Sequence, residues 1–430
     1  MTPRRPDPAL FAIVGEGFFS RLSFGFISFA LPLYAYRMGL SLTAIGFLAS
    51  LNLIVALVLK PVMGAAADRF GRKSSFVVAI VLRSLVSLLL VFATVPWHLF
   101  ALRALHGVSI AIRDPAANAL IAEHGGKKAI ASAFAWYQTA KSVAGALGKS
   151  WAGVLLTLTD SRFSLVFLVA FVVSEVPILL VLRYVQEAGG RSPVLAEMGP
   201  AAEESEALDQ ARKQPRQRSA ADRPPLLRFA GLGFGISGTA YMLANLFPVL
   251  AVEYAGLSEA EAGLVYTLSS FVVLAGPAFG WLSDHVSRRL VLSLRSVANV
   301  CSSAVYLIAP NFAGMATGRL LDDLGKAAFR PAWGALMAQV SNFDVRRRAR
   351  TMGYLSAGED AGEIAGPIVA GLLWSMWGVP VLLGVRIAFA IATELYTTAL
   401  TASLHRSEGG PSGPVLPARP RSGRPSREPA

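Results

Sequence analysis

The sequence predicts an all-α polytopic membrane protein in which twelve transmembrane helices form two parallel six-helix bundles. Three observations predict this fold: an apolar composition, a series of apolar segments, and a repeat that relates the two halves. Of the 430 residues, 54% are apolar and 16% are charged, whereas soluble proteins carry about 25% charged residues. The mean hydropathy of +0.51 agrees. This composition excludes a soluble enzyme, a disordered protein and a small disulfide scaffold.

Twelve apolar segments follow one another along the chain, separated by polar breaks. The length of each segment is near or above the about 20 residues that a helix needs to cross a bilayer. Their expected bounds are 9–36, 42–65, 74–95, 97–122, 129–158, 163–185, 227–253, 259–283, 290–310, 312–340, 350–376 and 379–404. The chain is therefore expected to divide into an N-terminal six-helix bundle (1–185), a cytoplasmic linker (186–226), a C-terminal six-helix bundle (227–404) and a disordered cytoplasmic tail (405–430).

Basic residues cluster in every second connection between these segments, and the net charge of the chain is +13. Because cytoplasmic connections of membrane proteins are enriched in Lys and Arg, both termini are expected in the cytoplasm. The location predicted for this multi-pass protein is a bacterial-type inner (plasma) membrane. Basic residues placed between apolar runs favour an anionic bilayer surface as their partner, so no nucleic-acid partner is expected.

The two halves of the chain repeat with a shift of 216 residues. Seven pairs keep the residue type at this shift: Pro32 and Pro248, Pro61 and Pro277, Gly64 and Gly280, Asp68 and Asp284, Arg72 and Arg288, Arg103 and Arg319, and Pro115 and Pro331. In segments five and eleven the shift becomes 218, which pairs Gly148 with Gly366 and Gly153 with Gly371. Two parallel copies of a six-helix unit around a central cavity are typical of a transporter that rocks between two access states.

A conspicuous loop follows the second apolar segment and has a partial copy in the second half. It reads Gly64-Ala-Ala-Ala-Asp68-Arg69-Phe-Gly71-Arg72-Lys73, and the copy reads Gly280-Trp-Leu-Ser-Asp284 followed by Arg288-Arg289. The loop resembles the signature motif of the major facilitator superfamily, Gly-x-x-x-Asp-Arg-x-Gly-Arg-Lys. The resemblance covers both halves and implies a secondary transporter, in which these loops act as cytoplasmic latches of the outward-facing state.

Segment four contains Arg103-Ala-Leu-His106-Gly107, which resembles a second motif of the same family, Arg-x-x-x-Gly. The resemblance associates this motif with proton coupling in antiporters. On a helical wheel Arg103 shares a stripe with Gly107 and Asp114. Segment ten carries the matching charges Arg319, Asp322, Asp323, Lys326 and Arg330. Such charges are costly within a bilayer, so they either line the cavity or form salt bridges that hold helices in register.

Segments five and eleven carry further charges. Lys141 and Lys149 lie in segment five, where Lys149 replaces the proline that antiporters of the family usually have. Segment eleven holds Glu359, Asp360 and Glu363. Neighbouring carboxylates disfavour each other's ionisation, so they can carry a proton near neutral pH. Alternatively they hold a cationic substrate or pair with the basic residues of segment ten.

Two further pairs of charges lie in apolar segments. Glu16 and Arg21 of segment one either line the cavity or pair with Arg113 or Lys141. Arg386 and Glu394 lie in a segment that is peripheral in the family, so a structural pairing is expected there. The full set of cavity and coupling candidates is Glu16, Arg21, Arg103, Asp114, Lys141, Asp322, Asp323, Lys326, Arg330, Glu359, Asp360 and Glu363.

These features predict a secondary active transporter that moves a small solute or ion by alternating access, with proton-coupled efflux as the preferred mode. Its expected partners are the substrate, protons and the lipid bilayer, and the expected state is a monomer. We expect no enzymatic activity, no cofactor and no bound metal. Three alternatives remain: an organic-anion uptake carrier that uses the lysines and arginines, a metal-cation uptake carrier that uses the carboxylates, and a transport-dead relative that acts as a scaffold or receptor.

Overall fold

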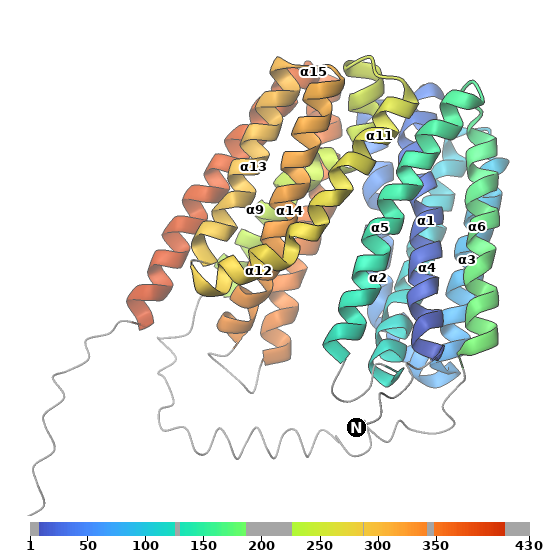
Figure 1. Cartoon of the computed structure of the whole chain (residues 1–430), viewed down its shortest axis with the longest axis horizontal. Helices are drawn as coiled ribbons and strands as arrows, with labels where there is room; N and C mark the ends of the chain where they lie inside the picture. Colours follow the sequence, from blue (N-terminus) through green and yellow to red (C-terminus); the bar gives the residue numbers. More distant parts are fainter. Residues whose placement is uncertain (1–7, 125–129, 186–225, 287, 342–347, 409–430) are drawn as a thin grey trace, which may run out of the picture.

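The computed structural model describes residues 8–124, 130–185, 226–286, 288–341 and 348–408, and helices make up its secondary structure (Figure 1). In the first half each predicted segment is one helix, with bounds that differ by a few residues from the expected ones. These helices are α1 (Pro8–Arg37), α2 (Leu42–Phe70), α3 (Arg72–Val91), α4 (Pro96–His124), α5 (Ile130–Leu158) and α6 (Phe163–Tyr184).

The second half follows the same order, but several of its helices are divided. Segment seven comprises α9 (Leu226–Ala244), α10 (Phe247–Val249) and the π-helical turn η2 (Leu250–Tyr254), and segment eight comprises α11 (Glu259–Ser270), the 3₁₀ turn η3 (Phe271–Ala275) and α12 (Gly276–His285). Then come α13 (Arg288–Ile308), α14 (Phe312–Ser341) and α15 (Arg348–Glu408). Pro248 and Pro277 lie at two of the divisions, where proline lacks the donor that a continuous helix requires.

The long α15 contains both of the last two predicted segments. Its backbone is non-helical at Gly378, where φ is 80° and ψ is 178°. This positive φ favours glycine, and Pro380 follows two residues later. The break falls between the expected end of the eleventh segment at 376 and the expected start of the twelfth at 379. The non-helical backbone at Gly378 therefore separates these two segments. The last helix continues to Glu408, beyond the expected end at 404.

Seven stretches of the described residues are apolar and long enough to cross a membrane by length and composition alone. They lie in α1, α2, α3, α6, α9, α13 and α15. The remaining predicted segments either contain charged residues, as in α4, α5 and α14, or are divided, as between α11 and α12. Length and composition therefore identify continuous helices with few charges more readily than helices that carry several charges or are divided.

The two six-helix bundles converge at one end and diverge at the other (Figure 1). We call the first the joined end, where α5 ends and α11 begins, and the second the basic end, where α2 ends next to Arg69. One hydrophobic core spans both bundles at the joined end and includes Phe29, Leu48 and Phe247. Two smaller cores lie toward the basic end, one around Phe76 of the first bundle and one around residues of α9 and α14 in the second. The bundles thus share apolar packing at the joined end only, among the described residues.

Two close helix crossings connect the bundles at the joined end. A Cβ atom on Gly46 of α2 would lie 2.2 Å from the carbonyl oxygen of Pro367 in α15, and one on Gly153 of α5 would lie 2.1 Å from that of Glu259 in α11. Glycine is required here because only its missing side chain permits such an approach. Gly371, the repeat partner of Gly153, belongs to the first crossing. The two crossings are therefore counterparts in the repeat.

The loop that resembles the superfamily signature lies at the basic end. Gly71 separates α2 from α3 with φ of 93°, a conformation that other residues rarely adopt. Arg69 is exposed and Lys73 is half-buried. The side chains of the remaining latch candidates lie outside the described part, namely Gly64, Asp68, Arg72, Gly280, Asp284, Arg288 and Arg289. Residues 186–225 and 409–430, which contain nearly all of the predicted linker and tail, also lie outside it.

Candidate functional site

A buried ion pair lies in the first bundle between α1 and α4. The Nε and Nη2 atoms of Arg113 donate to the two carboxylate oxygens of Glu16 over 2.9 and 2.8 Å, and Nη2 also donates to the Tyr137 hydroxyl over 2.8 Å. Glu16 is fully buried and Arg113 is 4% exposed. Of the alternatives that the sequence left open for Glu16, the structure realises the pairing with Arg113.

A polar cavity of about 270 Å³ adjoins this pair. Its lining includes Lys60, Asp114, Tyr137 and Lys141. The Asp114 carboxylate lies 3.6 Å from the Lys60 Nζ atom, and the Lys141 Nζ atom lies 5.0 Å from the centre of the Tyr137 ring. Both lysines and Asp114 are partly exposed, so this cavity offers cationic groups, one carboxylate and an aromatic face to a solute.

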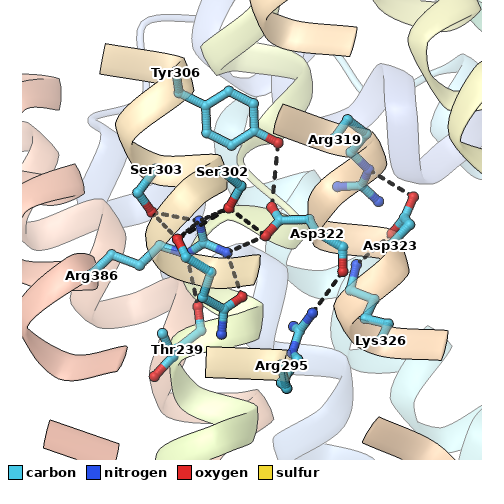
Figure 2. Close-up of polar contacts among 11 residues, drawn as sticks. Thr239, Arg295, Ser302, Ser303, Tyr306, Arg319, Asp322, Asp323, Lys326 and Arg386 are labelled. Atoms are coloured by element: carbon cyan, nitrogen blue, oxygen red, sulfur yellow. Dashed lines mark hydrogen bonds and ion pairs between the residues drawn. The ribbon is translucent and has the colours of Figure 1, made fainter. Parts of the chain in front are cut away.

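The second bundle contains a denser polar cluster centred on Asp322 of α14 (Figure 2). The Arg386 Nη2 atom and the Ser302 hydroxyl each donate to its Oδ1 atom over 2.7 Å, and the Tyr306 hydroxyl donates to Oδ2 over 3.3 Å. The Arg295 Nη1 atom donates to its backbone carbonyl over 2.7 Å. Arg386 is fully buried and Asp322 is 3% exposed. Asp322 is thus enclosed within one bundle.

The position of Arg386 corrects a prediction from the sequence. Arg386 pairs with Asp322 rather than forming a peripheral pair with Glu394, which instead accepts a hydrogen bond from Ser293. Arg386 also donates to the Thr239 carbonyl over 3.0 Å. Its guanidinium therefore points into the second bundle, toward helices that are distant in the sequence, and the sequence provides no signal for that choice.

The neighbouring Asp323 has its own two cationic partners. Arg319 lies 3.2 Å from one carboxylate oxygen and Lys326 lies 3.1 Å from the other. The Arg319 guanidinium also stacks 4.6 Å from the centre of the Tyr266 ring, and the Lys149 Nζ atom lies 4.3 Å from the same ring. Asp323, Arg319 and Lys326 thus form a mutually paired group, which leaves Lys326 unavailable as the main partner of the carboxylates on α15.

Three carboxylates lie close together on α15, and two of them, Asp360 and Glu363, have electrostatic neighbours in the first bundle. Glu359 accepts a hydrogen bond of 3.1 Å from the Trp333 indole, and it lines a small cavity of about 50 Å³ together with Arg330. All three side chains are partly buried. No ion pair joins Glu359, Asp360 or Glu363 to any residue that the structure describes. Within the described part of the chain they are therefore carboxylates without a fixed cationic partner.

Groups from both bundles surround these carboxylates. Glu363 lies beside the hydroxyl of Tyr241 on α9, and Arg21 of the first bundle lies within electrostatic range of it. Asp360 has Lys60 and Asp114 of the first bundle as its electrostatic neighbours. The site thus brings together sequence candidates from segments one, four and eleven. Within the described residues there is no group of three or more His, Cys, Asp and Glu side chains arranged to hold a metal ion.

Arg103, like Asp322 and Asp323, lies away from the carboxylates of α15. Arg103 is 8% exposed inside the first bundle, where it donates to the backbone carbonyls of Leu48 and Ala49. The sequence reasoning missed other residues of the site. Lys60 and Arg295 are charges within apolar segments, a signal that would have identified them. Tyr137, Tyr241 and Trp333 carry no comparable signal, because aromatic residues are common in membrane helices.

Sequence comparison decides the family. The model of the Major Facilitator Superfamily matches residues 17–273 and 229–423. This chain belongs to the Major Facilitator Superfamily. The resemblance seen in the loop motif is confirmed, and so is the predicted fold class. This superfamily member is a multi-pass membrane transporter and not an enzyme.

Solved structures with this fold include transporters at low sequence identity. A bacterial homologue of the human lysosomal transporter Spinster, in an inward-facing and occupied conformation, matches with a TM-score of 0.67 and 14% identity over 93% of this chain and 96% of that one. A structure from a study of proton-dependent oligopeptide transporters matches with a TM-score of 0.71 and 14% identity over 93% and 99%. At 14% identity, these similarities show a shared fold and nothing further.

Several curated relatives are resistance proteins. The multidrug resistance protein MdtG of Serratia proteamaculans is 33% identical over 181 residues, which are 39% of this chain and 42% of the relative. The methylenomycin A resistance protein of Bacillus subtilis is 28% identical over 156 residues, 36% and 32% of the two chains. The quinolone resistance protein NorA of Staphylococcus aureus is 26% identical over 133 residues, 30% and 33%. The matched parts span about a third to two fifths of these relatives.

Proposed function

We propose that this protein is a proton-coupled exporter of small organic molecules, located in the inner (plasma) membrane with both termini in the cytoplasm. The observation that carries this proposal is the set of carboxylates at Glu359, Asp360 and Glu363. Asp360 and Glu363 have electrostatic neighbours in the first bundle, and none of the three carboxylates has an ion-pair partner among the described residues. A group that carries a proton across the membrane must bind and release it within one cycle, which a permanently paired carboxylate does poorly.

Glu363 is the preferred proton carrier, because its neighbours come from both bundles. Tyr241 belongs to the same bundle as Glu363, whereas Arg21 belongs to the other. Rocking changes the distance from Glu363 to Arg21 and leaves the distance to Tyr241 nearly unchanged. An approaching guanidinium stabilises an ionised carboxylate, and its withdrawal favours the protonated form. The movement of the bundles and the movement of the proton are coupled in this way.

The proposed orientation follows from the positive-inside rule, which places the basic end in the cytoplasm. The joined end then faces away from the cytoplasm, and the conformation described above corresponds to an inward-facing state. The division into two rocking units at 1–185 and 227–404, with the linker between them and the two loops as latches, is part of the same proposal. A single chain contains both faces of the site, which supports a monomeric transporter surrounded by lipid.

The relatives support export of an organic solute, since their names refer to multidrug, methylenomycin A and quinolone resistance. The cavity at Lys60, Asp114 and Lys141 measures about 270 Å³, close to the lower limit of about 300 Å³ for sites that bind small organic molecules. Its aromatic face at Tyr137 and its charges of both signs suit a substrate with a ring and a polar group. Entry from the cytoplasm would bring such a solute to this cavity in the inward-facing state.

The decisive experiment measures proton movement in proteoliposomes that hold the purified protein. A quinolone and methylenomycin A serve as test solutes, and an internal pH dye reports the proton flux that accompanies solute uptake or release. The wild type is expected to couple the two fluxes, and Glu363→Gln is expected to lose the coupling. Glu175→Gln is the matched control, because Glu175 is a membrane carboxylate that contacts Ser84 inside the first bundle.

Each alternative has a distinct result in the same vesicles. Proton-coupled transport that survives the combined change of Glu359, Asp360 and Glu363 to amides contradicts the proposal. Accumulation of organic anions that depends on Lys60 and Lys141 identifies an uptake carrier for anions. Uptake of divalent metals that depends on the carboxylates identifies a metal carrier. A folded protein that moves none of these solutes supports a scaffold or receptor.

A further inference from the structure

A small cavity inside the first bundle lies between α1, α3 and α4, away from the carboxylates of α15. Its polar lining consists of Arg83, Arg103 and His106, which are 7%, 8% and 4% exposed. The rest of the lining is apolar and includes Ile27 and Leu90. The cavity leaves about 10 Å³, which is room for one water-sized or monatomic species. An organic substrate does not fit there.

The two arginines of this cavity have no carboxylate partner among the described residues. Arg103 donates from Nε and Nη2 to two backbone carbonyls over 3.2 Å each, while its buried Nη1 atom has no hydrogen-bond partner. The Arg83 guanidinium makes no hydrogen bond or ion pair with the described part of the chain, and its contact is the ring of Phe24 at 5.3 Å. Arg21 and Arg103 lie over the same ring at 5.0 and 5.9 Å.

The surrounding charges do not balance these guanidinium groups. The nearby carboxylate of Glu16 is engaged by Arg113 through two hydrogen bonds. Arginine stays protonated in proteins, so Arg83 and Arg103 carry their charge inside a membrane bundle. Buried charges of this kind are normally paired. Backbone carbonyls and an aromatic face stabilise a cation but do not neutralise it, so this cavity favours an anion.

The internal repeat shows what occupies the equivalent place in the second bundle. Shifted by 216 residues, Val86, Leu90, Leu102, Arg103 and His106 fall on Ser302, Tyr306, Gly318, Arg319 and Asp322. These are the residues around the Asp322 carboxylate, which accepts from Ser302, Tyr306 and Arg386 (Figure 2). The position of the second carboxylate, Asp323, falls on Gly107. The first bundle thus keeps the arginine of this position, as Arg103, but has His106 and Gly107 where the second bundle has its two carboxylates.

The packing of the helices supports this equivalence. In the first bundle the Ser109 hydroxyl of α4 donates to the carbonyl of Ala79 in α3 over 2.8 Å. At the shift of 216 residues these positions are Gly325 of α14 and Arg295 of α13. A Cβ atom on Gly325 would lie 3.1 Å from the Arg295 guanidinium. The pairs α3–α4 and α13–α14 therefore pack in the same register. The cavity of the first bundle occupies the position that corresponds, in the second bundle, to the Asp322 carboxylate.

We propose that Arg83, Arg103 and His106 bind a single halide-sized anion, chloride in the cell, which takes the place that the Asp322 carboxylate occupies in the second bundle. The free Nη1 atom of Arg103 and the guanidinium of Arg83 supply charged donors, and the neutral imidazole of His106 supplies one uncharged N–H donor. The cavity size excludes phosphate, sulfate and carboxylate-bearing solutes. Because the site lies within one bundle, the anion stabilises that bundle and is not transported.

Thermal unfolding of the purified, detergent-solubilised protein tests the proposal. Transitions are compared in sodium chloride, sodium bromide and sodium gluconate at one ionic strength. An anion that binds the folded state raises the transition by mass action, so chloride and bromide should raise Tm by about 3–5 °C over gluconate at saturation. The increase should saturate with anion concentration. Equal transitions in the three salts would overturn the proposal.

A carboxylate introduced into the site provides the sharper test. His106→Asp places in the first bundle the residue type that the second bundle has at the equivalent position. The new carboxylate should replace the bound anion, so the variant should keep a high Tm in gluconate and lose the response to chloride. His98→Asp is the matched control, since it makes the same change in α4 outside the cavity and should keep the chloride response. A chloride response in His106→Asp equal to that of the wild type contradicts the proposed site.

Crystals grown in bromide locate the ion directly. Anomalous scattering at the bromine edge should give a peak between the guanidinium groups of Arg83 and Arg103. A halide-dependent Tm with the anomalous peak elsewhere in the protein would overturn the assignment to this cavity. These outcomes do not depend on transport, so they remain distinguishable from a failure of the proposed export function.

Discussion

The two bundles share a fold and a helix order but differ in how they stabilise their buried arginines. In the second bundle Arg319 lies 3.2 Å from Asp323, and Arg386 lies 2.7 Å from Asp322. In the first bundle Arg103, the repeat partner of Arg319, contacts two neutral carbonyls. Apolar packing of equivalent helices has therefore been kept, while the polar groups between them have diverged.

This difference also separates structural charges from charges that are available for transport. Pairs such as Arg386 and Asp322 are enclosed in one bundle and satisfied there. Asp360 and Glu363 of α15 have electrostatic neighbours in the first bundle, among them Lys60 of α2 and Arg21 of α1. A charge that is satisfied within a rigid unit does not sense rocking, whereas a charge between two units does. The comparison therefore predicts large stability effects inside the bundles and functional effects between them.

The largest expected effect is in the second bundle. Arg386→Gln removes the guanidinium that pairs with the Asp322 carboxylate and leaves that charge buried. Breaking a buried ion pair in this way costs about 3–5 kcal/mol. The double variant Arg386→Gln with Asp322→Asn removes both charges and should be less destabilised than the sum of the two single variants. Denaturant or thermal unfolding in detergent measures both. Simple additivity would show that the two residues do not act as a pair.

Glu16→Gln in the first bundle should have a smaller but still large effect. Arg113 would lose its carboxylate partner, yet it would keep the Tyr137 hydroxyl at 2.8 Å and Asp114 at 3.7 Å. We expect a loss of about 2–3 kcal/mol, toward the lower end for a buried pair because of these remaining contacts. The same unfolding measurement applies. A loss larger than that of Arg386→Gln would show that the buried pair of the first bundle contributes more to stability than the buried pair of the second.

The close crossings at the joined end connect the bundles and should control the balance of conformations. Gly153→Leu places a side chain where a Cβ atom already lies 2.1 Å from a carbonyl oxygen, so it should favour separation of α5 from α11 by about 1–3 kcal/mol. Distances between spin labels across the joined end measure this shift. The labels are placed in a Cys301→Ser background, because Cys301 is the single cysteine of the chain.

Gly384→Leu is the matched control for that experiment. A Cβ atom on Gly384 meets nothing within 4 Å, so the same change there should leave the label distances as in the wild type. If Gly153→Leu also leaves them unchanged, the crossing does not limit the separation of the bundles. Gly46→Leu, at the counterpart crossing of α2 and α15, should act in the same direction as Gly153→Leu.

The smallest effect is expected at the edge of the joined end. The ion pair between Arg37 and Glu259 is 2.7 Å long, and its arginine side chain is 42% exposed. Arg37→Gln should cost less than about 1 kcal/mol, because solvent and salt screen exposed pairs. Unfolding in low and high salt measures this, and the cost should shrink in high salt. A cost that rivals Glu16→Gln would mean that this pair is effectively buried.

The twelve segments could be predicted from the sequence because their signal is local. A lipid-crossing segment must satisfy its backbone hydrogen bonds internally, so it forms a helix wherever enough apolar residues follow each other. The bounds of α1 and α6 accordingly agree with the prediction within a residue or two. The break between the last two segments was also expected, and the structure places it at Gly378. The repeat predicted the parallel arrangement of the two bundles.

The partners of the buried charges could be predicted only in part. The sequence placed Arg113 among the possible partners of Glu16, but it had no means of choosing between Arg113 and Lys141. It paired Arg386 with Glu394 along one helix, whereas the structure pairs Arg386 with Asp322 across two helices. It also overlooked Lys60 and Arg83, whose importance depends on what surrounds them.

The sequence by itself thus determined the helices, their order, the repeat and the family, since hydropathy and motifs act over short stretches of chain. Only the tertiary structure decided which buried charge meets which partner, and which charges lie between the bundles. Glu16 and Arg113 are separated by 97 residues, and Arg386 and Asp322 by 64. Electrostatic pairing depends on distance in space, and that distance is set by how distant helices pack.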